Sequence, residues 1–274
     1  GDSYQVNFTF QLDFKWLGSS PFAFFHHLRL KQSVKSAIYL SFPQDIVCSF
    51  SPELFLRKQS PTLITRPMKG THARAGNLQN DQAIVANLPK DPKIISENLM
   101  IVDLLRNDLQ KVAEPLSVKV TELFHVETYT TLHQVVSQIE AKLDDHCNDQ
   151  GLAQLFKALF PCGSITGAPK LRTQQIIQEL ESSPRQIYTG AIGVIKPNKD
   201  FEFNVAIRTI QIKNESQIPT AKMGIGSGIV YDSKMEDEFD ECWLKSQFLR
   251  SLNSDLLLIE SFRWCAAEQK FLRL

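Results

Sequence analysis

Three strand-like stretches follow one another near the C-terminal end of the chain, with no helical pattern between them. They cover residues 188–195, 201–212 and 220–230, contain many β-branched and aromatic residues, and are bounded by turn-forming residues. This order is typical of antiparallel hairpins. It favours a fold in which neighbouring strands pair directly rather than through crossover helices.

The rest of the chain mixes strands and helices. Strand patterns predict strands at residues 5–12, 37–42, 45–50, 53–57, 62–66 and 117–127. Helical patterns predict helices at residues 22–30, 91–112, 132–143, 152–159, 170–180 and 235–252, and residues 70–80 are predicted to be a polar loop. Because helices and strands do not alternate regularly, we predict an α+β fold with antiparallel sheets.

The composition argues against several classes of protein. The 274 residues are 43% apolar and 22% charged, which suits a folded core. The 30 basic and 30 acidic side chains cancel, so the balance gives no attraction to nucleic acid or to an anionic membrane. The 5 cysteines are scattered, which argues for a reducing compartment, and no apolar run approaches the ~20 residues of a membrane span. We therefore expect a cytoplasmic protein.

Two predicted helices carry carboxylates that could bind a divalent metal. Glu97 shares a helical face with apolar residues such as Ile101, although a first-turn glutamate also complements the helix dipole. Glu238 and Glu241 lie one turn apart on the last predicted helix, and Lys245 follows one turn later. This spacing fits either a solvated face with an ion pair or two oxygen ligands for Mg²⁺.

Other motifs indicate an anionic ligand. Residues 163–170 form a glycine-containing turn before a helix, where backbone N–H groups favour anions. Residues 224–230 have glycines at alternate positions, which suits close approach of a ligand or another strand. Arg208 is predicted to point inward from a strand and to need an anionic partner. Lys69 is either an exposed turn residue or, if desolvated, a nucleophile. Together these features predict a site for a small polycarboxylate with Mg²⁺.

Six segments in this order resemble the chorismate-utilising enzymes, which include anthranilate synthase component I, aminodeoxychorismate synthase component I, isochorismate synthase and salicylate synthase. The matching segments are residues 51–53, 67–71, 97–108, 163–170, 207–209 and 226–241. The resemblance implies an α+β fold of two large, packed, mostly antiparallel sheets with outer helices. It also implies a Mg²⁺-dependent reaction on chorismate.

The resemblance assigns two groups of ligand-binding residues. It implies that Glu97 and Glu241 bind Mg²⁺, with Glu238 in support. It also implies that Arg208 and Tyr188 hold the enolpyruvyl carboxylate of chorismate.

The resemblance also assigns the residues around the chorismate ring. The backbone of Gly226 and Gly228, together with Lys245, would contact the ring carboxylate, and Thr71 would line the pocket. Glu53 would be the general acid that protonates the departing 4-hydroxyl.

Two positions select a subfamily by resemblance. Isochorismate and salicylate synthases carry a lysine base where this chain has Gln5, the pattern of the ammonia-using members. Anthranilate synthases usually carry alanine where this chain has Lys69, whose amine would attack the ring at C2. The resemblance is therefore nearest to aminodeoxychorismate synthase component I, a transaminase-type enzyme of 4-aminobenzoate and folate synthesis. Ammonia would come from a glutamine amidotransferase subunit.

Two residues depart from the family pattern. Gln134 stands where the family generally has a histidine, and His133 lies one residue earlier. A neutral amide can hydrogen-bond to the substrate but cannot relay a proton. Ile94 replaces an acidic residue that is common three positions before Glu97. Anthranilate synthase component I and a catalytically impaired chorismate-binding homologue therefore remain alternatives.

The ends of the chain predict its domain organisation. The chain begins Gly1-Asp2 without a signal peptide, which is typical of a fragment. We expect residues 1–253 to be the chorismate-binding catalytic domain without the family's N-terminal portion. Residues 254–274 form an extension that resembles the start of an aminodeoxychorismate lyase-type domain.

Overall fold

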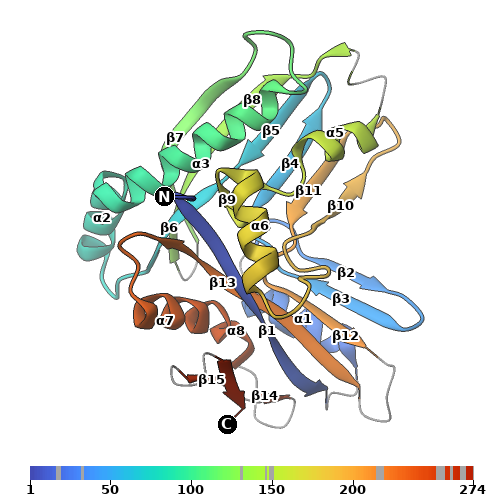
Figure 1. Ribbon diagram of the computed structural model, residues 1–274, viewed down its shortest axis with the longest axis vertical. Coiled ribbons are helices and arrows are strands. Elements are labelled where there is room, and N and C mark those ends of the chain that lie inside the picture. The colour runs from blue at the N-terminus through green and yellow to red at the C-terminus, as the bar shows by residue number, and fades with distance from the viewer. Residues whose placement is uncertain are drawn as a thin grey trace.

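Two large sheets form the framework of the protein. The computed structural model describes residues 1–16, 20–31, 34–129, 132–145, 147, 151–213 and 219–250, and the backbone of residues 257–259, 262–265 and 270–273. Figure 1 shows the first sheet, called sheet A here, in the lower half of the view and the second, sheet B, in the upper half.

Sheet A has the strand order β14-β1-β13-β12-β3-β2, and β9 pairs with the start of β1. Its strands are β1 (Gln5–Trp16), β2 (Ile38–Ser41), β3 (Asp45–Ser49), β9 (Gly167–Ala168), β12 (Thr209–Lys213), β13 (Thr220–Val230) and β14 (Leu257–Ile259). The long β1–β13 pair is its centre, and the predicted hairpin around Pro43 is confirmed by the pairing of β2 with β3.

Sheet B has the strand order β10-β11-β4-β5-β8-β6, and β7 also pairs with β8. Its strands are β4 (Leu54–Gln59), β5 (Thr62–Arg66), β6 (Met68–Ala73), β7 (Lys119–Thr128), β8 (Leu132–Lys142), β10 (Ala191–Ile195) and β11 (Phe201–Val205). The pairings recorded in both sheets are antiparallel. A short separate pair is formed by β15 (Phe262–Cys265) and β16 (Lys270–Arg273).

Helices cover the sheets from outside (Figure 1). They are α1 (Pro21–Lys31), α2 (Leu78–Asn87), α3 (Pro92–Gln110), α5 (Leu152–Leu159), α6 (Lys170–Leu180), α7 (Met235–Lys245) and α8 (Gln247–Arg250), with 3₁₀ turns η1 (Leu88–Lys90) and η2 (Gly163–Ile165). Helix α3 packs on β6, β7 and β8, whereas α7 packs on β13 and α6 on β1. These elements confirm the predicted α+β class with two antiparallel sheets. No helix among the described residues has the length and apolarity needed to cross a membrane.

The apolar core has one large part against each sheet. One part joins sheet A to α1 and α8 and includes Phe50 and Met223. The other joins sheet B to α3 and α5 and includes Ile101 and Ile139. Val47 of sheet A belongs with Ile192 and Ala206 to a smaller cluster that links the two sheets.

Local sequence explains the long helix α3, which carries part of the candidate site. The Asp91 side chain caps it by accepting hydrogen bonds from the Lys93 N–H at 2.8 Å and the Ile94 N–H at 3.3 Å. Pro92 occupies the first turn, where its missing N–H costs nothing. Ile101 and Leu105 then lie one turn apart and are buried.

The predicted helix at residues 132–143 is wrong, because this segment is the strand β8. Its apolar residues at positions 132, 135, 136, 139 and 143 match helical spacing. The strand pairs with β5, β6 and β7 and is buried along most of its length. Residues on both of its faces must therefore suit a buried environment. This burial removes the simple alternation by which a strand is recognised.

Two other segments also differ from prediction. Residues 70–80 are not a loop, since β6 ends at Ala73 and α2 starts after the cap of Asn77, whose Oδ1 accepts from the Asn80 N–H at 2.8 Å. Residues 201–212 are not one strand, since β11 lies in sheet B and β12 in sheet A. Arg208 lies between them with a φ of 47°, so it does not share a strand face with Ala206 as predicted.

The C-terminal predictions stand partly outside the described residues. The predicted helix at 235–252 is divided into α7 and α8, and its last two residues are outside the described part. The division of the chain at residue 253 stays a prediction.

Candidate active site

Lys69 lies on β6, in a backbone segment that is fixed to α3. The Lys69 carbonyl accepts a hydrogen bond of 3.0 Å from Asn98 Nδ2. Gly70 has a φ of +87°, and a β-carbon there would lie 2.8 Å from Ile94, so only glycine fits. A β-carbon built on Gly228 of β13 would lie 3.6 Å from Lys69 Nζ. The amine therefore reaches the glycine-rich part of sheet A.

The surroundings of the Lys69 amine change its protonation. Burial lowers the pKa of Lys69, and the charge of Lys245 acts in the same direction, whereas the carboxylates of Glu53, Glu97 and Glu241 oppose it. Three carboxyl groups from different parts of the chain are therefore close enough to act on the charge of this one amine. A lowered pKa increases the neutral fraction that can act as a nucleophile or base.

Glu53 follows sheet A and precedes β4, and its side chain is buried at 5% exposure. Burial raises the pKa of Glu53, while a hydrogen bond from Ser164 and the charges of Lys69 and Lys245 act to lower it. Among the described residues its Oε1 has no hydrogen-bond partner. A raised pKa favours the protonated form of the carboxyl group, and this form can give its proton to a ligand.

Glu97, Glu238 and Glu241 approach one another from α3 and α7. Burial raises the pKa of Glu97, and the charges of Glu241 and Glu238 raise it further, while Lys69 and Lys93 act to lower it. Glu241 pairs with Lys245 at 2.7 Å, and Glu238 Oε1 accepts from the Ser233 hydroxyl at 2.7 Å. The carboxylates thus share one region, although each of them already has a partner, since Glu97 also pairs with Lys93 at 3.9 Å.

The carboxylates of Glu97 and Glu241 could supply only part of the ligand shell of a magnesium ion. Among the described residues no group of three His, Cys, Asp or Glu side chains is arranged to hold a metal by itself. Mg²⁺ usually takes one or two carboxylates and completes its shell with water and substrate oxygens. The mutual repulsion of Glu97 and Glu241 is what a cation between them would relieve.

Arg208 and Tyr188 provide donors near the junction of the sheets. Burial lowers the pKa of Arg208, and the part of the chain that the structure describes gives its guanidinium no ion pair. Burial raises the pKa of Tyr188, so its hydroxyl stays protonated. The Tyr188 ring covers Gly224, where a β-carbon would lie 2.1 Å from ring atoms. Both side chains can donate to an anion.

The β1–β13 pair supplies polar backbone and one amide. Gly226 is directly opposite Thr9, and a β-carbon there would lie 2.4 Å from the Phe8 carbonyl oxygen, which confirms the predicted close approach of another strand. The Gly226 carbonyl accepts from Lys245 Nζ at 2.7 Å. Gln5 is 2% exposed, and the part of the chain that the structure describes offers its Oε1 no hydrogen-bond partner.

Thr71 and Gln134 are opposite each other in the β6–β8 pairing. The Thr71 hydroxyl donates to Gln134 Oε1 at 2.7 Å, and Gln134 Nε2 donates to the Gly70 carbonyl at 2.9 Å. The adjacent His133 is fully buried and instead contacts Asp81 Oδ1 at 2.8 Å. Gln134 therefore lies beside Gly70 and Thr71, whereas His133 supports the start of α2.

Sequence reasoning missed three supporting residues. Asn98 holds the Lys69 backbone, Ser164 holds Glu53, and Asp81 joins His133 to Arg74. Asn98 follows a predicted metal ligand on a helix and is a polar residue on its buried side, which is a usable signal. Nothing in the local sequence marks Ser164 or Asp81, since their partners are distant in the chain.

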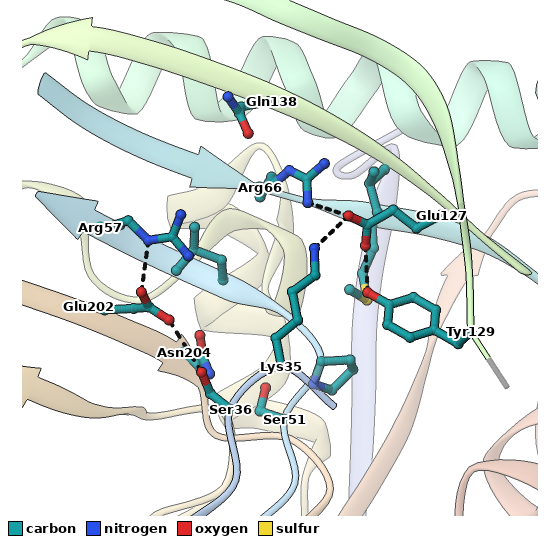
Figure 2. A pocket seen from close by; sticks show the side chains of 14 residues that line it. Lys35, Ser36, Ser51, Arg57, Arg66, Glu127, Tyr129, Gln138, Glu202 and Asn204 are labelled. Atoms are coloured by element: carbon teal, nitrogen blue, oxygen red, sulfur yellow. Dashed lines mark hydrogen bonds and ion pairs between the residues drawn. The ribbon is translucent and has the colours of Figure 1, made fainter. Parts of the chain in front are cut away.

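The structure has a cavity of about 100 Å³. Pro52 and Met68, which directly precede Glu53 and Lys69 in the sequence, are among the residues that line it. None of the predicted site residues lines it. Figure 2 shows an ion pair between Arg57 and Glu202 on one side and Lys35 reaching toward Glu127 on the other. Ion pairs thus line this cavity on two sides.

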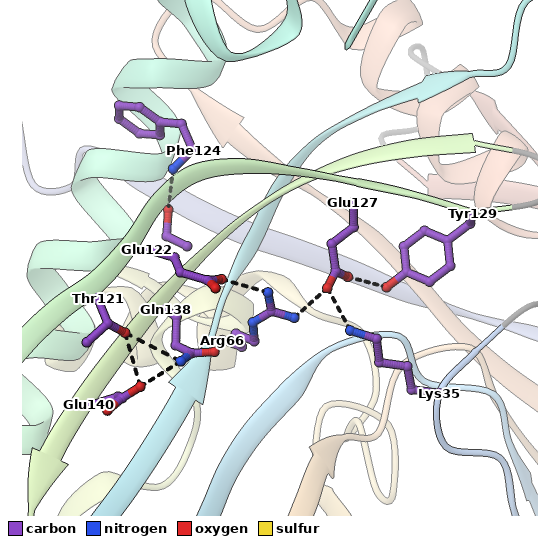
Figure 3. Close-up of polar contacts among 10 residues, drawn as sticks. Lys35, Arg66, Thr121, Glu122, Phe124, Glu127, Tyr129, Gln138 and Glu140 are labelled. Carbon is purple, nitrogen blue, oxygen red and sulfur yellow. Dashed lines mark hydrogen bonds and ion pairs between the residues drawn. The ribbon is translucent and has the colours of Figure 1, made fainter. Parts of the chain in front are cut away.

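Glu127 is the centre of the charged network shown in Figure 3. It accepts from Lys35 and Arg66, each at 2.6 Å, and from the Tyr129 hydroxyl. Arg66 also pairs with Glu122 at 2.8 Å. Burial acts to raise the pKa of Glu127, but the three hydrogen bonds outweigh it and lower that pKa to about 2.

We expect Glu127→Gln to destabilise the protein in a pH-dependent way. A carboxylate with a lowered folded-state pKa stabilises the fold above its unfolded pKa and loses this effect as the pH falls toward 2. The shift corresponds to about 2–3 kcal/mol at pH 7. Urea unfolding should give a variant difference of that size at pH 7 which shrinks toward pH 3. Glu122→Gln, at a more exposed position, is the control and should cost less than about 1 kcal/mol. An equal Glu127→Gln difference at both pH values would contradict the assignment.

Comparison with known proteins identifies the class. The family described as chorismate binding enzyme matches residues 1–251, and the chain belongs to this family. Anthranilate synthase component I from Streptococcus pneumoniae superposes with a TM-score of 0.79 at 30% identity, covering 90% of this chain and 53% of that one.

The similar curated proteins carry more specific names. The chloroplastic aminodeoxychorismate synthase of Arabidopsis thaliana is 40% identical over 250 residues, which cover 90% of this chain and 26% of that protein. Aminodeoxychorismate synthase component 1 of Klebsiella aerogenes is 38% identical over 255 residues, which cover 93% of this chain and 55% of that protein. The chain thus spans between about a quarter and about half of these relatives.

Proposed function

We propose that the chain is the chorismate-converting part of an aminodeoxychorismate synthase, which forms 4-amino-4-deoxychorismate from chorismate and ammonia. The names of the similar curated proteins support this choice. The structural observation that carries it is the Lys69 amine, whose pKa is lowered by burial and which lies near Glu53 and Glu97.

The reaction uses Lys69 as the nucleophile and Glu53 as the acid. Lys69 Nζ bonds to ring C2, the ring electrons shift, and the C4–O bond breaks. Glu53 gives its proton to the departing oxygen, so that water leaves. Ammonia then adds at C4, the electrons return, and the bond between C2 and Lys69 breaks to release the neutral amine. The ammonium group formed at C4 returns one proton to Glu53. Atoms balance, because chorismate and ammonia become aminodeoxychorismate and water.

The other residues hold the two carboxylates of chorismate. Arg208 and Tyr188 bind the enolpyruvyl carboxylate, for which a buried guanidinium with no ion pair to any described residue is suited. Lys245 binds the ring carboxylate beside Gly226 and Gly228. A magnesium ion held by Glu97 and Glu241, with Glu238 nearby, would offset the charge of that carboxylate when bound.

We propose that ammonia reaches this chain from a glutamine amidotransferase subunit. The relative from Klebsiella aerogenes is named as component 1, which implies a further component. We propose that Gln5 receives the ammonia, which is supported by its buried Oε1: this atom has no hydrogen-bond partner in the described ranges and can accept from an N–H group.

A product assay tests the proposal. The chain is incubated with chorismate, ammonium and Mg²⁺, and the products are separated by chromatography with mass detection. We expect an amino product that retains the enolpyruvyl group. Fluorescent anthranilate with released pyruvate would instead identify an anthranilate synthase, the function named for the S. pneumoniae neighbour. Chorismate binding by calorimetry without any turnover at high ammonium would identify a catalytically impaired homologue.

A further inference from the structure

The Gln134 side chain connects two neighbouring groups of β6 in one fixed direction. It is 5% exposed, and its amide lies between the Gly70 carbonyl at 2.9 Å and the Thr71 hydroxyl at 2.7 Å. A carbonyl oxygen can only accept, so the amide NH₂ must face Gly70. The amide oxygen must then face Thr71, and this oxygen can only accept.

The direction of these two hydrogen bonds determines whether the Thr71 hydroxyl can donate to a ligand or only accept from it. The single hydroxyl hydrogen of Thr71 is used by Gln134. Thr71 is an exposed residue, and its hydroxyl oxygen can offer only lone pairs to a ligand. The amide thus makes Thr71 an acceptor for any group that approaches it.

Chorismate has a single group that suits such an acceptor. Its two carboxylates and its enol ether oxygen only accept hydrogen bonds, whereas its ring hydroxyl has the only O–H. A carboxylate placed against Thr71 would meet lone pair against lone pair, which is unfavourable in a partly buried site. The hydroxyl is also the group that leaves in the proposed reaction.

We propose that Gln134 is a positioning residue that orients the Thr71 hydroxyl as an acceptor for the ring hydroxyl of chorismate, and so fixes the orientation of the substrate ring. This inference rests on the proposed function, because it takes chorismate as the ligand. It assigns Gln134 a role that acts through Thr71 rather than by direct contact with the substrate.

A double-mutant cycle on chorismate binding tests the inference. The variants are Gln134→Leu, Thr71→Val and the two combined, and the dissociation constant for chorismate with Mg²⁺ is measured by calorimetry. We expect each single variant to bind roughly 3- to 10-fold more weakly, the scale of one aligned hydrogen bond. The double variant should bind no more weakly than Thr71→Val alone, because Gln134 has nothing left to orient.

Controls separate a local role from a general loss of structure. Thr71→Ser keeps the hydroxyl and should restore binding and coupling. Gln138→Leu removes another glutamine of β8, whose amide contacts Glu140, and should leave chorismate binding unchanged. Gln134→Met replaces Gln134→Leu if the latter does not fold, as judged by thermal unfolding.

The outcomes distinguish this inference from the proposed function. If Gln134→Leu weakens binding equally with Thr71 and with Val at position 71, Gln134 does not act through Thr71 and the inference is wrong. That result leaves the proposed function intact. If the unchanged protein does not bind chorismate at all, the proposed function fails and the inference fails with it.

Discussion

Replacing Lys69 with alanine is expected to abolish ammonia-dependent formation of aminodeoxychorismate while the fold and chorismate binding persist. The amine is the only proposed nucleophile, and its environment lowers its pKa through burial. Loss of a nucleophile typically costs roughly 10⁴-fold in turnover or more. Product formation from chorismate and ammonium, followed by chromatography, measures the change.

Two further variants make this result specific. Lys69→Arg keeps a positive charge but cannot supply a neutral amine, so it should be as inactive as Lys69→Ala. Lys222→Ala, on β13 with a surface ion pair to Asp13 at 3.2 Å, should retain activity. Full ammonia-dependent activity in Lys69→Ala would rule out the nucleophile assignment, and activity in Lys69→Arg would mean that only the charge matters.

The second large effect is expected for Glu53→Gln. The glutamine amide fills nearly the same volume but cannot give a proton to the departing hydroxyl. We expect turnover to fall by about 10²–10⁴-fold, the usual contribution of a general acid. Chorismate binding should change only a few-fold, so the loss should appear in kcat rather than in KM.

The matched control for this variant is Glu202→Gln on β11. Glu202 is partly buried and pairs with Arg57 at 2.8 Å, on the cavity that lies apart from the proposed site. Its replacement should leave turnover unchanged. An unchanged kcat in Glu53→Gln would show that another group protonates the leaving oxygen.

The sequence predicts strands best where their residues are alternating or β-rich and their ends are marked by turns. The hairpin around Pro43 and the long β1–β13 pair have alternating or β-rich residues and clear ends. Prediction failed for β8, because a strand with neighbours on both edges and packing on both faces shows apolar residues at helical spacing. It also failed at Arg208, since one continuous apolar pattern conceals the exchange between sheets.

The candidate site could be predicted only where its residues lie in recognisable segments. Lys69, within β6, and Glu53, just before β4, lie in motifs that resemble a known family. Ser164 and Gln134 act through partners that are far away in sequence, so their geometry comes from the folded chain alone. A one-residue shift on a strand reverses its side-chain direction, and this explains why His133 and its neighbour have unrelated roles.

The position of Arg208 has a mechanical consequence. The chain leaves one sheet after Val205 and enters the other at Thr209, so this guanidinium belongs to the short crossing between two halves of the molecule. An anion bound by Arg208 would contact the segment that joins the two sheets. A ligand that binds only the folded protein raises its free energy of unfolding by an amount that grows with ligand concentration relative to Kd. Binding at Arg208 should therefore raise the melting temperature of both sheets together.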